Sequence, residues 1–204
     1  MIGKGKSISH GVAALEYDLA KEINGQAVAT EIARHELYGC TGAEMVQEMK
    51  PYHIDFPNVK NNCLRFEVSP SIEESATFTD ADWAELGNDF MQRMGLANHQ
   101  YIIIRHSGTE SKKEQAHLHI LANRVSLSGE LYRDNWIGKK ATEAANAIAK
   151  ERNFVQSQDI GKVNKAEIKE AMDGVLKKMQ GFDFTKFKEE LGKRGFKVRE
   201  ARAS

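Results

Sequence analysis

Hydrophobic and polar positions alternate cleanly in one short segment of the chain, Cys63–Ser69. The positions on one side of this segment are all apolar: Leu64, Phe66 and Val68. A period of two residues is typical of a half-buried strand. Two runs of mainly aliphatic residues, 101–106 and 117–125, predict two further strands, and the polar segment between them indicates that they pair as a long hairpin.

A second pattern, with apolar residues at every third or fourth position, predicts helices. It is clearest between residues 79 and 95, where the apolar stripe consists of Trp83, Leu86, Phe90 and Met94. Gly95 follows this stripe as a left-handed cap. The same spacing predicts further helices over 11–21, 139–152 and 165–179.

Three segments are less regular. We expect residues 26–49 to be helical in pieces, with a break near Gly39 and a second piece that begins at a capping box with Thr41. The segment 51–62 contains two of the three prolines and predicts an irregular connection. The segment 182–198 predicts a helix, a glycine stop and a strand-like tail.

The order of these elements is a helical start, strands with one helix between them, and a helical end. This order is typical of an α+β fold. We therefore predict a central, mostly antiparallel sheet with helices on its faces and a C-terminal helical subdomain. The core around the sheet is expected to span residues 1–155, and residues 156–204 are expected to form a helical extension of the same module.

The composition is that of an ordinary globular protein, with 41% hydrophobic and 28% charged residues. No apolar run approaches the roughly 20 residues that cross a bilayer, and the N-terminus lacks the apolar core of a signal peptide, so we expect a cytoplasmic protein that does not bind membranes. Two cysteines are too few for a disulfide framework. Basic and acidic residues balance at 29 each, yet bases outnumber acids between Lys186 and Arg202, where a local surface can hold phosphates.

Three of the seven histidines lie in one short window: His106, His117 and His119. Alternate side chains of a strand share a face, so His117, His119 and Asn123 point the same way, and we expect this face to be polar and open to a cleft. His106 ends the neighbouring strand, within reach of the other two. Three imidazoles can hold a divalent cation and leave positions open for substrate. They could equally be surface histidines hydrogen-bonded to water, and Asn123 fits either a partner of the ligands or an ordinary strand residue.

Four segments of the chain occur together in a known family: Glu-Val-Ser-Pro-Ser, Thr-Asp-Ala-Asp-Trp, Met-Gly-Leu-Ala-Asn-His-Gln-Tyr-Ile-Ile-Ile-Arg-His, and His-Leu-His-Ile-Leu-Ala-Asn-Arg-Val. With them the sequence resembles the relaxases, the mobilisation nucleases of conjugative and mobilisable elements, within the class named for its histidine-hydrophobic-histidine strand. The resemblance is densest from Phe66 to Asn153. Members of the family usually continue well past the length of this chain, so this chain can be the nuclease module of a longer protein.

The resemblance implies that the metal ligands are His106, His117 and His119, with Asn123 as the motif asparagine. It implies a transesterification on single-stranded DNA at an origin of transfer, in which a tyrosine oxygen attacks a phosphodiester, keeps the 5′ phosphate and releases a 3′ hydroxyl. The family's nucleophile falls on Tyr17. A phenol with the usual tyrosine pKa of about 10 is ionised to only about 0.1% at neutral pH, so the site has to assist the loss of its proton.

Two further residues are candidates for catalysis. His10 lies seven residues before Tyr17 and is expected on the same side of the first helix, as a base, an orienting group or a rival nucleophile. The family commonly has an acid close behind the first histidine, whereas Ser107 and Gly108 follow it here. Glu110 is our candidate for the missing carboxylate.

Imidazoles favour borderline ions such as zinc, nickel or manganese, while the resemblance implies Mg²⁺ or Mn²⁺, so manganese satisfies both arguments. We expect basic DNA contacts from Lys4, Lys6, Arg105 and Arg124, together with the basic tail. Trp136 or Tyr132 could stack on a splayed base. The expected partners are single-stranded DNA at an origin of transfer and accessory mobilisation proteins, and the expected state is a monomer.

Other functions fit the same residues. A rolling-circle replication initiator uses the same chemistry, although such proteins more often place the tyrosine after the histidines, whereas Tyr17 precedes them here. A non-catalytic DNA-binding accessory protein would use the histidines for a structural ion or for none. A metal-dependent hydrolase of small molecules would show a narrow, deep pocket.

Overall fold

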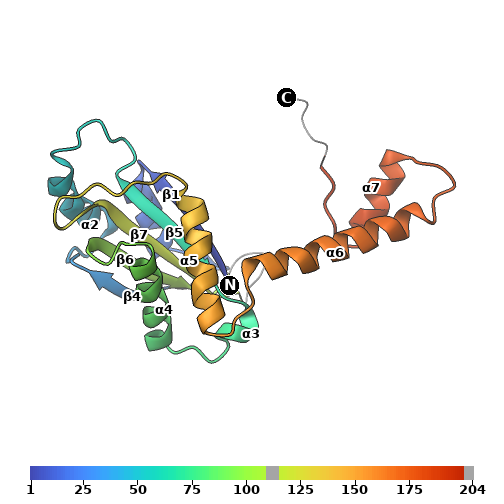
Figure 1. Ribbon diagram of the computed structural model, residues 1–204, viewed down its shortest axis with the longest axis horizontal. Coiled ribbons are helices and arrows are strands. Elements are labelled where there is room, and N and C mark those ends of the chain that lie inside the picture. The colour runs from blue at the N-terminus through green and yellow to red at the C-terminus, as the bar shows by residue number, and fades with distance from the viewer. Residues whose placement is uncertain (109–114, 200–204) are drawn as a thin grey trace. The chain divides into compact units, whose positions relative to one another are not determined.

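The computed structural model describes residues 1–108 and 115–199. Its chain divides into two compact units, Met1–Ser157 and Gln158–Ser204. The first contains the sheet and the second is helical (Figure 1). An α+β fold was expected and is confirmed, whereas the boundary at residue 155 and the assignment of both units to one module stay predictions.

A five-stranded antiparallel sheet forms the centre of the first unit, in the order β1-β5-β7-β6-β4. Its strands are β1 (Ile2–Ile8), β4 (Ala29–His35), β5 (Cys63–Ser69), β6 (His99–His106) and β7 (His117–Ser126). A separate two-stranded ribbon consists of β2 (Glu22–Ile23) and β3 (Gln26–Ala27). The three predicted strands are confirmed, as is the antiparallel pairing of the last two.

The helices of this unit are α1 (Gly11–Leu19), α2 (Gly42–Met49), the short 3₁₀ helix η1 (Lys50–His53), α3 (Ile72–Ser75), α4 (Asp80–Arg93) and α5 (Ile137–Glu151). Capping boxes begin α2, α3 and α4, at Thr41, Ser71 and Thr79. They satisfy backbone N–H groups that the first turn of a helix leaves without a partner. Gly95, after α4, has the predicted left-handed conformation, with a φ of 72°.

Helices pack on both faces of the sheet. Helices α4 and α5 pack on one face (Figure 1), over a core that includes Phe66, Ile103 and Ile120. Helices α1 and α2 pack on the other, over Ile102, Ile104 and Leu121. The expectation that the histidine-bearing face of β7 is polar and open to a cleft is therefore wrong, because Leu121 on that face joins the second core.

We expected residues 26–49 to be helical in pieces, but the first half of this segment is not helical. Strands β3 and β4 lie there instead. The apolar residues of β4 also suit a helical spacing, so local periodicity is ambiguous in this segment. Pairing with β6 decides the outcome, since it supplies backbone hydrogen bonds that periodicity does not reveal.

The edge strand β1 escaped prediction because its alternation is of glycine and lysine. Gly3 and Gly5 face α5, and a Cβ atom on Gly3 would lie 2.4 Å from the carbonyl oxygen of Ala141. Lys4 and Lys6 lie on the opposite face, since successive side chains of a strand alternate. Glycine takes the place of the usual apolar residue because the helix backbone leaves no room for a side chain.

Gly3→Ala is expected to lower the free energy of unfolding by about 1–3 kcal/mol, because the added methyl group overlaps the backbone of α5 and pushes the helix off the sheet. Gly138→Ala is the matched control in the same interface. A Cβ atom there would lie 3.5 Å from the carbonyl oxygen of Gly5, an ordinary contact, and alanine suits a helix better than glycine. Urea denaturation measures both variants, and equal midpoints for Gly3→Ala and the parent would contradict the close packing.

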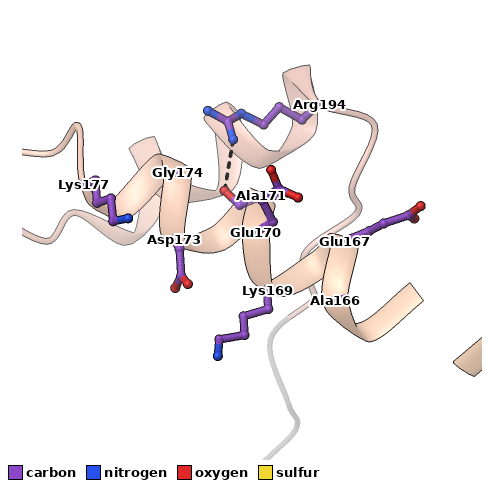
Figure 2. A pocket seen from close by; sticks show the side chains of 9 residues that line it. All are labelled: Ala166, Glu167, Lys169, Glu170, Ala171, Asp173, Gly174, Lys177 and Arg194. Carbon is purple, nitrogen blue, oxygen red and sulfur yellow. Dashed lines mark hydrogen bonds between the residues drawn. The ribbon is translucent and has the colours of Figure 1, made fainter. Parts of the chain in front are cut away.

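The second unit consists of α6 (Ser157–Leu176) and α7 (Phe184–Lys193). Its small core contains Ala171, Val175, Phe187 and Leu191, with Met179, Phe196 and Val198 packed against them. Figure 2 shows a hollow on α6 into which Arg194 reaches, and its guanidinium donates to the carbonyl of Ala171 at 3.1 Å. The predicted strand-like tail is not found in residues 194–199, because Phe196 and Val198 pack on the helices and residues 158–199 contain no strand edge to pair with.

Across residues 1–108 and 115–199, no helix combines the length and the apolarity that a transmembrane segment needs.

Candidate active site

Three imidazoles meet at one end of the β6–β7 pair. His106 on β6 lies opposite His117 on β7, and His119 follows two residues later on the same face. One ring nitrogen from each side chain lies within 4.8 Å of those of the other two. The ring centroids are 4.5–5.4 Å apart. The structure therefore brings together the three residues predicted as metal ligands, which we call the histidine cluster.

The hydrogen bonds of these rings indicate which nitrogen carries a proton. A carbonyl oxygen can only accept, so His117 Nδ1 donates to the carbonyl of Gln115 at 3.1 Å, and His106 Nε2 donates to that of Asp18 at 2.7 Å. The Nε2 atoms of His117 and His119 are 3.1 Å apart, so one donates to the other. Because the proton of His117 is on Nδ1, His119 Nε2 is the donor.

Burial favours the neutral form of His106 and His119. Burial, together with the charges of His106 and His117, lowers the pKa of His119 to about 2. Burial also lowers the pKa of His106, whose side chain is 2% exposed. A neutral imidazole is the form that binds a cation, so these rings need not lose a charge before they bind one.

The donor set suits a divalent cation. A cation bound to the Nε2 atoms of His117 and His119 would displace the proton that they share. His119 Nδ1 accepts a long hydrogen bond from the Arg65 guanidinium at 3.4 Å and lies 3.8 Å from the carboxylate of Asp18, so the displaced proton would leave the pair. The paired Arg65 and Asp18 side chains fix the orientation of the His119 ring, as groups behind a metal ligand usually do. Three imidazoles favour borderline ions over magnesium.

Asp18 was not named from the sequence, yet it touches two members of the cluster. Its carbonyl accepts from His106, and its carboxylate accepts from Arg65 and faces His119. The side chain is almost fully buried, and burial raises the pKa of its carboxyl group against the effect of the Arg65 guanidinium. A signal was present in the sequence, because this acid lies in the buried stripe of α1, which consists of Gly11, Ala14, Leu15 and Asp18.

Tyr17 precedes Asp18 on α1 and is 56% exposed. Its hydroxyl oxygen accepts a hydrogen bond from Lys21 Nζ at 2.6 Å, and the same ammonium lies 4.8 Å from the centre of the phenol ring. The charge of Lys21 also contributes to the lowered pKa of His106, so it acts within electrostatic range of the cluster. The predicted nucleophile is thus an exposed residue that directly precedes Asp18 and contacts a lysine whose charge reaches His106.

The structure does not bring His10 to Tyr17. His10 is exposed and directly precedes α1, and its side chain forms no capping hydrogen bond. Seven residues of helix place it about 10 Å from Tyr17 along the axis, too far for a base or an orienting group in hydrogen-bond contact. A role for His10 in the reaction stays a prediction that this geometry does not support. Glu110 lies outside the described residues.

A hollow of about 220 Å³ opens beside His119, between β1 and β5. Its lining residues are Lys4, Gly5, Lys6, Arg65, Phe66, Glu67 and His119. Lys4 pairs with Glu67 at 2.7 Å. Small-molecule sites usually hold about 300–1,000 Å³, so this shallow, basic hollow suits part of a longer, anionic ligand better than a small substrate.

Two other predicted DNA contacts are engaged within the fold. Arg105 pairs with Asp80 at 2.5 Å. Arg124 pairs with Asp134 at 2.7 Å and donates to the carbonyls of Asn61 and Tyr132. These bonds fix loops around the sheet, and contact of either guanidinium with DNA stays a prediction.

Asn123 does not reach the histidine cluster. It shares a face of β7 with His119 but lies four residues away, about 13 Å along the strand. Its buried amide group accepts from His53 at 2.6 Å and donates to Gln100 at 3.0 Å and to the carbonyl of Met49 at 3.3 Å. The geometry therefore ties η1 to the sheet and gives no support to Asn123 as a partner of the metal ligands.

An antiparallel sheet with three imidazoles on adjacent strands, next to a helix with an accessible tyrosine, defines the site expected for a nuclease of the histidine-hydrophobic-histidine class. The family model described as relaxase, MobA/VirD2-like, nuclease domain matches residues 17–154. This match covers well over half of the chain, so the chain belongs to that family, and the resemblance seen in the sequence is confirmed. Strand β1, His10 and the second unit lie outside the match.

Two solved structures of a relaxase match the chain weakly. One is the conjugative relaxase TrwC in complex with OriT DNA, in its metal-bound structure, with 10% identity, a TM-score of 0.46, and coverage of 100% of this chain and 93% of that chain. The other is the metal-free TrwC complex with OriT DNA, with 10% identity, a TM-score of 0.44, and coverage of 98% and 72%. At these scores the likeness adds nothing to the family assignment. No curated protein matches the sequence.

Proposed function

We propose that this chain nicks one strand of DNA at an origin of transfer and joins itself to the 5′ phosphate through Tyr17. The observation that carries the proposal is the convergence of the histidine cluster on Asp18, the residue that follows Tyr17. Family membership indicates the class of reaction, and this convergence supports the proposal that the reaction takes place between Tyr17 and the histidine cluster.

The proposed step exchanges one phosphodiester for another. The phenol oxygen of Tyr17 forms a bond to the scissile phosphorus, and the bond between phosphorus and the 3′ oxygen breaks. The proton of the phenol passes through solvent, and the leaving oxygen becomes a 3′ hydroxyl. Because the ester is conserved, the step needs no ATP and can run backwards to rejoin the ends.

Two side chains next to Tyr17 assist this step. The ammonium of Lys21 lies 2.6 Å from the phenol oxygen, where it orients the ring and stabilises negative charge as the proton leaves. Asp18 is a positioning residue, because it holds His106 through its carbonyl and faces His119 with its carboxylate.

His106, His117 and His119 would hold a divalent ion, manganese or magnesium. Bound there, the ion supplies Lewis-acid stabilisation of the charge on the phosphate oxygens. Manganese agrees best with three imidazole donors.

The backbone of the DNA is proposed to follow the hollow beside His119 towards the edge of the sheet. Lys4, Lys6 and Arg65 line this path and offer positive charge to the phosphates. The basic residues of α7 and the tail after it, accessory mobilisation proteins and a monomeric state remain predictions.

A random pool of single strands tests the proposal. With Mn²⁺, the chain is expected to form a protein–DNA adduct that survives boiling in detergent, and a chelator is expected to suppress it. Sequencing the attached 5′ ends should give one common nick sequence, and the same sequence in a fully paired duplex serves as the control. If no strand yields an adduct, the chain is not a nicking enzyme, and a non-catalytic DNA-binding protein is left.

A further inference from the structure

Trp136 is presented to solvent at the start of α5. Its side chain is 81% exposed, while the chain's other tryptophan, Trp83, is 2% exposed in the core. The backbone of Trp136 is left-handed, with φ 59° and ψ 28°, a conformation that few residues other than glycine, asparagine and aspartate adopt. The indole therefore projects from the turn instead of joining the core.

Two lysines and a glutamate share a hollow with this indole. Trp136, Lys139, Lys140 and Glu143 line a hollow of about 300 Å³. Lys139 pairs loosely with Glu143, at 3.8 Å between two well-exposed groups. Lys140 Nζ donates to the carbonyl of Arg133 at 2.8 Å and lies 5.0 Å from the centre of the Tyr132 ring. An exposed aromatic face beside lysines suits single-stranded nucleic acid, whose bases stack while its phosphates pair with cations.

This hollow adjoins the edge of the sheet through the packing of α5 on β1. A Cβ atom on Gly138 would lie 3.5 Å from the carbonyl oxygen of Gly5, and Thr142 donates to the carbonyl of Gly3 at 3.1 Å. The helix therefore runs antiparallel along β1, which is an edge strand. Trp136 precedes the first helical residue, so it lies near the end of β1 that follows Gly5.

The opposite side of the same strand leads to the histidine cluster. Lys4 and Lys6 project there and line the hollow beside His119. Acidic residues outnumber basic residues in the first unit as a whole, so the basic groups on both sides of β1 are a local feature. Trp136 thus lies near one end of the strand whose other side carries Lys4 and Lys6.

We propose that Trp136 is a stacking platform for one base of the single-stranded DNA, with Lys139 against a neighbouring phosphate. The proposal rests on the proposed function for its ligand class. It does not depend on the identity of the nucleophile or of the metal ion.

Binding of a fluorescent single-stranded oligothymidine to the full chain, in the presence of a chelator, tests the platform without cleavage. Trp136→Ala is expected to weaken binding by about 5- to 100-fold, while Trp136→Phe keeps an aromatic face and should stay within about threefold of the parent. Both changes are at an exposed position, and thermal melting confirms that the variants are folded. Equal affinities for the parent and Trp136→Ala would overturn the platform.

Intrinsic fluorescence gives a second readout. Saturation with oligothymidine should quench the emission of Trp136 in the parent, and this quenching should vanish in Trp136→Phe, where the buried Trp83 is left. A single abasic position in the strand should weaken binding to the parent but not to Trp136→Ala, which identifies the stacked base. Unquenched emission at saturation would refute stacking.

These outcomes separate the platform from the nicking reaction. If no strand ever forms an adduct but quenching and the loss of affinity are seen, the platform stands and the proposed chemistry falls. If Trp136→Ala binds like the parent and still forms the adduct, the chemistry stands and the platform falls.

Discussion

Tyr17→Phe is expected to abolish the covalent protein–DNA adduct and to slow strand cleavage by at least about 10³-fold, because phenylalanine has no oxygen to attack the phosphate. Tyr17 is 56% exposed, so the free energy of unfolding should change by no more than about 0.5 kcal/mol. The affinity for Mn²⁺ should be unchanged, since the phenol is not a member of the histidine cluster. A strand labelled at its 3′ end measures the adduct on a denaturing gel, because the label stays with the 5′ phosphate.

Tyr38→Phe is the matched control for this prediction. Tyr38 is also an exposed tyrosine whose hydroxyl contacts one charged side chain, Glu36, and it lies outside the candidate site. This variant should form the adduct at the parental rate. An adduct that persists in Tyr17→Phe would contradict the assignment of the nucleophile. An acid-labile linkage would then indicate a phosphorus–nitrogen bond and direct attention to His10.

The histidine cluster could be predicted from the sequence because it depends on two patterns that the sequence shows. The alternation of β7 places His117 and His119 on one face, and the pairing of two β-branched runs brings His106 alongside. Both are local patterns with a single sensible register. The same alternation misled us about Asn123, since sharing a face says nothing about a separation of four residues along it.

Asp18 could not be predicted with the same ease because its role depends on where α1 lies on the sheet. Helical spacing of the apolar residues alone groups Val12 with Leu15 and Leu19, but Val12 is exposed in the structure and the observed stripe ends in Asp18. An acid in a buried stripe requires a partner, and here Arg65 and the histidine cluster supply it. If the buried face of α1 is taken as Gly11, Ala14, Leu15 and Asp18, it includes a carboxylate next to the candidate nucleophile.

The edge strand β1 shows a second limit of sequence patterns. Its glycines have low strand propensity, and the reason for them lies on α5, more than a hundred residues further along the chain. Lys4 and Lys6, which alternate with the glycines, were predicted as DNA contacts from their charge, but their alignment beside His119 follows from the pairing of β1 with β5. The long-range pairing of β1 with β5 thus places both lysines in the lining of the hollow beside His119.

His119→Ala is expected to reduce the affinity for Mn²⁺ by more than about 100-fold and to remove cleavage with it. Changes to residues that merely orient metal ligands already cost about 10–100-fold in affinity, so loss of a ligand should cost more. Calorimetric titration measures the affinity directly. Thermal melting gives a second readout, because Mn²⁺ at 100 times its dissociation constant stabilises the folded parent by about 2.7 kcal/mol, a gain that the variant should lose.

His35→Ala is the control for this variant, since His35 lies on the same sheet but stacks on Tyr101, at the far end of the β4–β6 pair from His106. It should bind Mn²⁺ like the parent even if its own packing loss lowers the melting temperature. A His119→Ala chain that still nicks DNA at the parental rate would remove the cation from the proposed reaction. The phosphate charge would then have to be stabilised by two neighbouring cations. One is Lys21, which donates to Tyr17, and the other is Arg65, which contacts His119; the charges of both lower the pKa of His106.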